Sequence, residues 1–283
     1  MNNTNVSAAL LCLALAACAA TAPSVSPTAK SELAPQGRVR VGILSANPLH
    51  VTQGGAPGAE MRGLAPDIGR ALARQLGAEF RPVGYPTAAG LLDGAARNEW
   101  DVAFIGYSPE RASDMDFTPV VVNGENSYLV RGDSPLRSVA DVDREGVRVG
   151  TSARTVQEVF LKQNLRRATV VSMPNNAALV QALVAGRVDA VAGNRQTMAE
   201  SNANTPGTRV LAGSFLQVPY AIAIRKGRPA GAAYASGFVQ YLKESGALDE
   251  AVKRANLTGV TVPQDYSQAG GVNVPTGSAA RRY

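Results

Sequence analysis

Cysteine and histidine are nearly absent from this chain of 283 residues. Its two cysteines, Cys12 and Cys18, both stand near the N-terminus, and His50 is its one histidine. Transition metals in proteins are held mostly by thiolate and imidazole groups, and a Ser-His-Asp triad needs a histidine. We therefore expect neither a metal nor another cofactor, and a catalytic triad would have to use His50.

Signature motifs of nucleotide and hydrolase chemistry are absent as well. The sequence has no G-x-x-x-x-G-K-[S/T], no G-x-G-x-x-G after a strand and no G-x-S-x-G. These absences argue against a P-loop, a dinucleotide-binding turn and a nucleophile elbow. The net charge is +6, but Lys and Arg never form a run longer than two. Nucleic-acid binding uses clustered basic stripes, so we expect no nucleic-acid partner.

Residues 1–18 are predicted to be a lipoprotein signal peptide. Residues 10–18 form a short apolar stretch that ends in small residues and is too short to span a bilayer. Leu15-Ala16-Ala17-Cys18 resembles the bacterial lipobox, in which the cysteine is diacylated and becomes the first mature residue. Cys18 is therefore the predicted lipidation site, and the lipid would anchor the protein to a membrane in the periplasm or cell envelope. The alternative is ordinary cleavage near Ala20, and residues 1–5 lack the basic charge usual in such signals.

The remaining chain divides into a linker, a globular part and a tail. Residues 19–36, rich in Ala, Ser, Thr and Pro, predict a linker that cannot pack a core, and residues 262–283 predict a flexible tail. Between them, strand and helix patterns alternate, which favours a mostly parallel α/β sheet. Residues 38–43 and 101–105 are predicted strands, and residues 66–77 and 87–97 are predicted helices.

An internal repeat indicates two lobes. The sequence VRVG occurs at 39–42 and again at 147–150, and residues 91–104 align without gaps to residues 179–192. Each copy contains a helix, a turn, an aspartate and a buried strand, so the chain would form two α/β lobes with a cleft between them. Chance similarity between Leu-rich helices and Val-rich strands is the alternative. We assign 37–124 and 220–261 to lobe 1 and 125–219 to lobe 2, with crossing segments at 122–128 and 216–224.

The segment 101–119, DVAFIGYSPERASDMDFTP, carries the strongest site signal. A buried strand ends at Gly106-Tyr107-Ser108, and Pro109 opens a short helix that contains Arg111. Ligands of open α/β sheets bind where strands end, and the planar guanidinium matches a carboxylate. Arg111 is therefore the predicted ligand anchor. The alternative is a surface arginine that pairs with an acidic neighbour on its own helical turn.

This segment resembles the bacterial extracellular solute-binding proteins of family 3, which carry a run D-A-I/V-…-T/S-x-E-R-…-V-D-F-S/T-x-P. The resemblance covers about residues 38–258. It implies an α/β, two-lobed periplasmic-binding-protein-like type II fold with a hinge of two crossing segments. It also implies that Arg111 holds the carboxylate of a ligand, with Ser108 and the backbone of Gly106 beside it. Tyr107 either lines the cleft or packs on the strand ends.

Residues 146–161 align with the family pattern G-x-x-V-G-V-x-x-G-T-T-x-E-x-x-L. Thr155 falls on the first threonine, at a helix N-terminus that attracts anions, while Arg154 replaces the family glycine. Arg154 points either into the cleft or to solvent. Asn194 stands where amino-acid binders usually have an aspartate that takes the α-ammonium group. A neutral amide binds a cation less well, so this departure puts a standard α-amino acid ligand in doubt.

The loop after the first strand also departs from the family pattern. Asn47 stands where the family often has tyrosine, and His50 where it has phenylalanine. Both are candidate cleft residues, with a solvated loop histidine as the alternative for His50. Tyr85 completes the predicted ligand-binding set.

The resemblance implies an extracytoplasmic solute-binding protein, not an enzyme, that delivers a small carboxylate-bearing solute to an ABC importer. Its expected partners are that solute, the permease in the inner membrane and the membrane itself through the lipid anchor, and we expect a monomer. One alternative is a cyclohexadienyl-dehydratase-like enzyme on the same fold, which needs an acid in the cleft, for which Glu110 and Glu125 are the nearest carboxylates. The other is a ligand-sensing partner of a membrane receptor.

Overall fold

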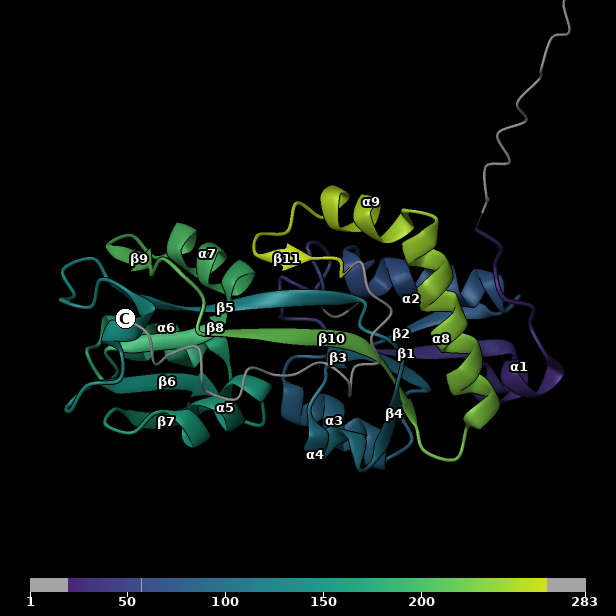
Figure 1. Ribbon diagram of the computed structural model, residues 1–283, viewed down its shortest axis with the longest axis horizontal. Coiled ribbons are helices and arrows are strands. Elements are labelled where there is room, and N and C mark those ends of the chain that lie inside the picture. The colour runs from purple at the N-terminus through teal and green to yellow at the C-terminus, as the bar shows by residue number, and fades with distance from the viewer. Residues whose placement is uncertain (1–19, 57, 264–283) are drawn as a thin grey trace, which may run out of the picture.

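The computed structural model of the protein describes residues 20–56 and 58–263, which fold into two α/β lobes joined by two long strands (Figure 1). The predicted signal peptide with Cys18 and nearly all of the predicted tail lie outside the described residues. No helix within the described part of the chain is long and apolar enough to cross a membrane.

Lobe 1 is built on three parallel strands in the order β2-β1-β3. These strands are β1 (Arg38–Leu44), β2 (Glu79–Tyr85) and β3 (Val102–Gly106). Its helices are α2 (Leu64–Gln75), α3 (Ala88–Ala96), α4 (Pro109–Ala112), α8 (Pro229–Glu244) and α9 (Ala247–Arg254), and the short strands β4 (Met115–Phe117) and β11 (Val260–Thr261) complete it. The largest apolar core of the described chain lies here, beneath α2 and α8.

Lobe 2 repeats this arrangement with parallel strands in the order β8-β6-β7. These strands are β6 (Arg148–Ser152), β7 (Thr169–Met173) and β8 (Ala190–Asn194). Its helices are α5 (Val156–Asn164), α6 (Asn176–Val184) and α7 (Arg195–Asn204), with a 3-10 turn at Val139–Asp141 and the short strand β9 (Thr208–Val210).

Two antiparallel strands, β5 (Val122–Arg131) and β10 (Leu216–Arg225), carry the chain between the lobes (Figure 1). At one end β10 pairs with β3 and β4, and at the other end β5 pairs with β8 and β9. The hydrogen-bonded ladder therefore continues from lobe to lobe through the two strands, and the predicted crossing segments coincide with them. The two crossings form the hinge of the two-lobed fold.

The internal repeat appears as one motif built twice. In lobe 1, the carboxylate of Asp101 accepts bonds from the backbone N–H of Arg40 at 3.0 Å, from its Nε at 2.9 Å and from its Nη2 at 2.8 Å. In lobe 2, Asp189 accepts the same three bonds from Arg148 at 2.9, 3.0 and 2.9 Å. Each pair ties the first strand of its lobe to the turn that enters the third strand. The shared Asp-strand spacing thus has a structural cause.

The predicted linker is wrong for part of its length. Residues Pro27–Leu33 form helix α1, capped by the Ser26 hydroxyl, and a 3-10 turn at Pro35–Gly37 leads into β1. Leu33 is 0 % exposed and belongs to the lobe 1 core, and Glu32 accepts a hydrogen bond at 2.6 Å from the backbone of Gly231 in α8. The composition of the segment does not reveal this helix, because two correctly spaced apolar side chains are enough to pack a short helix against the core.

Candidate functional site

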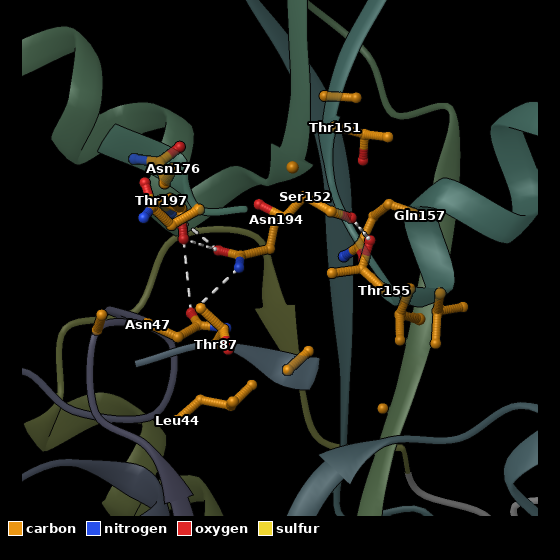
Figure 2. A pocket seen from close by; sticks show the side chains of 18 of the residues that line it. Leu44, Asn47, Thr87, Thr151, Ser152, Thr155, Gln157, Asn176, Asn194 and Thr197 are labelled. Carbon is orange, nitrogen blue, oxygen red and sulfur yellow. Dashed lines mark hydrogen bonds between the residues drawn. The ribbon is translucent and has the colours of Figure 1, made fainter. Parts of the chain in front are cut away.

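A cavity of about 460 Å³ lies between the two lobes (Figure 2). The carboxyl ends of β1, β3, β6 and β8 meet at it, together with the amino ends of α3, α5, α6 and α7 and the middle of β10. Strand ends are where open α/β sheets bind ligands, and helix amino ends present free N–H groups. Both lobes thus supply groups that could contact a solute of amino-acid size.

Arg111 lines the cavity from α4 and has partners in both lobes. Its Nη1 donates to the carbonyl of Gly106 at 2.6 Å, and its Nη2 donates to the carbonyl of Arg154, in lobe 2, at 2.9 Å. Burial lowers the pKa of Arg111 to about 10, so the guanidinium stays protonated at neutral pH. Five N–H groups are available on a guanidinium, and three of them remain for a ligand.

Thr155 caps α5 at the lobe 2 wall of the cavity. Its hydroxyl accepts from the backbone N–H of Glu158 at 3.2 Å and donates to the carbonyl of Ser152 at 2.7 Å. The N–H groups of Val156 and Gln157, in the first turn of α5, have no partner inside the helix, and both residues line the cavity. The side-chain oxygen of Thr155 is committed to the cap, so this corner offers chiefly backbone donors.

Asn194 and Asn47 meet across the cleft, as Figure 2 shows. The Nδ2 of Asn194 donates to the Oδ1 of Asn47 at 3.2 Å. Asn194 is the N-cap of α7, and its Oδ1 accepts from the backbone N–H of Thr197 at 2.8 Å and from the Thr197 hydroxyl at 2.9 Å. Both asparagines line the cavity, and their bond is one of the contacts between the two lobes.

Ser108 and Tyr107 lie beside the cavity but do not line it. The Ser108 hydroxyl is almost fully buried and accepts from the backbone N–H of Arg111 at 3.4 Å as the N-cap of α4. The ring of Tyr107 packs edge-on against Phe117, with centroids 5.2 Å apart. The two residues therefore support the loop that carries Arg111.

His50 and Tyr85 lie in the lobe 1 interior, away from the cavity wall. His50 is 0 % exposed and packs edge-to-face on Phe104 and Tyr220, with centroids at 5.0 and 5.8 Å. Neither of its ring nitrogens has a hydrogen-bond partner, and burial lowers its pKa to about 3. Tyr85 is buried, and its hydroxyl donates to Glu99 at 2.8 Å. Placing these two residues in the cleft from sequence is therefore a prediction that the structure does not support.

Arg154 reaches across the cleft mouth instead of into the cavity. Its φ of 58° lies in the left-handed region that favours the glycine of the family pattern. Its Nη1 pairs with the Oδ1 of Asp93 on α3 at 2.6 Å, and both side chains are about half exposed. Arg154 thus connects the lobes through its side chain and, at its carbonyl, through Arg111.

Sequence reasoning missed several residues that line the cavity. Thr151 is 0 % exposed and its hydroxyl has no hydrogen-bond partner. Burial raises the pKa of the Tyr220 phenol to about 12, so this group stays a neutral donor beside Arg111. The other missed residues are helix N-caps or lie in the first turns of helices: Thr87, Gln157, Asn175, Asn176 and Thr197.

A metal centre finds no support in the part of the chain that the structure describes, because no group of three or more His, Cys, Asp or Glu side chains there could hold an ion. The arrangement defines a class of protein in which two α/β lobes on a two-strand hinge form a cleft; among the described residues, amides, hydroxyls and one arginine line it. The chain belongs to the bacterial extracellular solute-binding proteins, family 3, whose sequence profile matches residues 39–256.

Individual relatives agree with this assignment. The chain is 27 % identical over 207 residues to the ABC transporter glutamine-binding protein GlnH of Bacillus subtilis, covering 69 % of this chain and 72 % of that protein. It is 26 % identical over 196 residues to the L-cystine-binding protein TcyJ of Escherichia coli, covering 68 % and 72 %. The fold matches the amino acid ABC transporter substrate-binding protein AbpA of Streptococcus pneumoniae, solved with L-arginine, with a TM-score of 0.68 and 24 % identity over 78 % of this chain and 94 % of that one. The fold and family predicted from the sequence are confirmed.

Proposed function

We propose that this protein captures a small carboxylate-bearing solute outside the cytoplasm and delivers it to an ABC importer. The observation that carries the proposal is Arg111, a half-buried guanidinium at the cavity wall with three N–H groups left for a ligand. A bidentate carboxylate fits this fork, and charge-assisted hydrogen bonds contribute about 1.5–3 kcal/mol each. The relatives named as ABC transporter proteins support delivery to a permease.

Capture proceeds by hinge closure about β5 and β10. One lobe binds the solute first, and the other closes over it, which shifts the population toward the closed form. The contacts between Arg111 and the Arg154 carbonyl and between Asn194 and Asn47 span the cleft, so they form only when the lobes close. Closure would present a surface made of both lobes to the permease.

The residues that line the cavity favour a solute-binding protein over an enzyme. A dehydratase-like reaction needs an acid in the cleft, and none of the described residues that line the cavity carries a carboxylate. Glu110 is exposed and does not line the cavity, and Glu125 pairs with Arg195 at 2.7 Å. A ligand-sensing role would use the same closure and differs only in the membrane partner.

The segment boundaries and the anchor complete the proposal. Lobe 1 comprises 37–124 and 220–261 with helix α1 added, and lobe 2 comprises 125–219. Cys18 is the lipidation site that holds a monomer at the membrane. Cys18→Ala should release the protein into the soluble fraction, and an unlipidated N-terminus at Ala19 or beyond on the native protein would contradict the anchor.

A thermal-shift screen of amino acids, hydroxy acids, dipeptides and other organic acids tests the binding function. A carboxylate-bearing solute should raise the melting temperature of the wild-type protein by several degrees and leave Arg111→Gln unshifted. Equal shifts in both proteins would contradict the role of Arg111. For delivery, uptake of the labelled hit should fall in cells that lack this protein and return when it is restored.

A further inference from the structure

The charged groups that line the cavity indicate which class of solute it binds. This inference rests on the proposed function. Of the described residues that line the cavity, Arg111 alone has a charged side chain. A zwitterionic amino acid brings an ammonium group as well as a carboxylate. Burying an unpaired ammonium ion is strongly unfavourable, and no lining side chain of the described chain offers it a counter-charge.

Asn194 cannot replace that counter-charge, because its oxygen is already used. Its Oδ1 accepts from the backbone N–H and from the hydroxyl of Thr197, at 2.8 and 2.9 Å. A backbone N–H can donate only to the oxygen, so the bond fixes the orientation of the amide. The Nδ2 group therefore faces the cleft and donates to Asn47, whose Oδ1 also accepts from the N–H of Leu49 at 3.0 Å. The position offers donors, and an ammonium group needs acceptors.

Two carboxylates on helices whose amino ends line the cavity, Asp93 on α3 and Glu158 on α5, are committed elsewhere. Asp93 pairs with Arg154 at 2.6 Å. Glu158 accepts from Lys162 at 2.7 Å and from the backbone N–H of Arg154 at 2.6 Å. Neither acid lines the cavity. Either acid could serve as a counter-charge for an ammonium group only by giving up these partners.

The other features of the cavity favour an anion with a neutral body. The N-caps of four helices, α3, α5, α6 and α7, line it, and helix amino ends stabilise negative charge. The buried Thr151 hydroxyl lacks a partner in the protein and can bond to a neutral polar group. Apolar side chains, among them Ile105, Met198 and Val218, share the wall. At about 460 Å³ the cavity is also far larger than a bare inorganic anion needs.

We propose that the solute is an organic carboxylate without a free ammonium group, such as a 2-hydroxy acid, a 2-keto acid or an N-acylated amino acid. Its carboxylate binds Arg111. A neutral hydroxyl, carbonyl or amide occupies the place beside Asn194 where a zwitterion would put its ammonium group. The cavity thus selects against free amino acids because none of the described residues that line it offers a carboxylate to pair with positive charge.

Matched ligand series test the inference by isothermal titration calorimetry. There are three sets, with the side chain of alanine, leucine or phenylalanine. Each set contains the free amino acid, the corresponding 2-hydroxy acid and the N-acetyl amino acid. In the set that binds most tightly, the hydroxy or acetyl form should bind at least tenfold more tightly than the amino acid. The Arg111→Gln variant should lose this binding.

Asn194→Asp supplies the decisive variant, because aspartate caps a helix as well as asparagine does and adds the missing counter-charge. It should shift the preference at least tenfold toward the amino acid. Asn204→Asp is the matched control, since it adds the same charge at the exposed far end of α7 and should leave the preference unchanged. Circular dichroism would confirm that each variant is folded.

The possible results distinguish an error in the solute class from an error in the proposed function. If free amino acids bind more tightly than both derivatives and Arg111→Gln abolishes that binding, the solute class is wrong and the carboxylate-binding function stands. If Asn194→Asp and Asn204→Asp change the preference equally, the assignment to Asn194 is wrong. If no set binds, or if Arg111→Gln binds as well as wild type, the proposed function fails and this inference fails with it.

Discussion

Replacing the repeated aspartate in each lobe should destabilise the protein by very different amounts. Asp101 is 0 % exposed and accepts from Arg40 and from Arg228 at 3.1 Å, with Arg225 at 4.0 Å. Asp101→Asn leaves these three guanidinium groups facing a neutral amide. Breaking a buried pair by removing one partner costs about 3–5 kcal/mol, and we expect the lower part of that range because the amide oxygen can still accept hydrogen bonds from Arg40.

Asp189→Asn is the matched control, because the same three bonds join Asp189 to Arg148 in a more exposed setting. The Asp189 side chain is 24 % exposed and that of Arg148 is 43 % exposed. Solvent screens such pairs, so we expect a cost of about 1 kcal/mol. Urea unfolding followed by circular dichroism and by fluorescence of Trp100, the single tryptophan, would measure both. Equal costs, or a larger cost for Asp189→Asn, would refute the argument from burial.

Three further predictions concern acid stability, the cleft mouth and helix α1. His50 has its ordinary pKa of 6.5 in the unfolded chain and a pKa of about 3 in the folded protein. The free energy of unfolding should therefore decrease as the pH is lowered from 6.5 towards 3, by up to about 1.4 kcal/mol per pH unit. His50→Phe should flatten this slope in urea titrations between pH 4 and 7, and an unchanged slope would contradict the neutral buried ring. A double-mutant cycle of Asp93→Asn and Arg154→Gln should give a coupling free energy in ligand binding below about 1 kcal/mol that vanishes in 1 M salt, as expected for an exposed ion pair. Coupling that persists in 1 M salt would contradict an exposed pair. Leu33→Ala should cost about 2–5 kcal/mol in thermal or urea unfolding, whereas a cost near zero would restore the linker interpretation.

The fold was predictable because its signals are local and repeated. The Val-Arg-Val-Gly strands and the aspartates 88 positions apart, from 101 to 189, mark the first strand of each lobe and the turn that enters its third strand. The crossing segments were located because they flank the second copy, with 122–128 before it and 216–224 after it. Helix α1 was missed because its composition is that of a linker, and only its contacts with α8 reveal it.

The site was predictable only where the backbone direction fixes where a side chain points. Gly106, Arg111, Thr155 and Asn194 line the cavity because they stand at strand ends, at a helix N-cap or on a first helical turn, and Asn47 lines it from the loop after β1. The directions of the side chains next to these residues could not be predicted from the sequence pattern. Ser108 turns back to cap its own helix, and the strand that ends in Tyr85 directs that ring into the core.

Residues contributed by distant segments were equally out of reach of the sequence. Tyr220 enters the cavity from the returning hinge strand, more than 100 positions after Arg111 along the chain. Arg154 replaces a glycine, and its bond to Asp93 on the other lobe depends on how the lobes close. Such contacts arise from tertiary structure and leave no periodic trace in the sequence.

The most direct test of the central claim is the affinity of Arg111→Gln for the best-binding carboxylate, measured by calorimetry beside Arg154→Gln. The first variant removes the guanidinium from the cavity wall, and the second removes a neighbouring guanidinium that lies outside it. We predict a loss of at least thirtyfold for Arg111→Gln, about 2 kcal/mol, and less than fivefold for Arg154→Gln. Wild-type affinity in Arg111→Gln, or the larger loss in Arg154→Gln, would contradict the account.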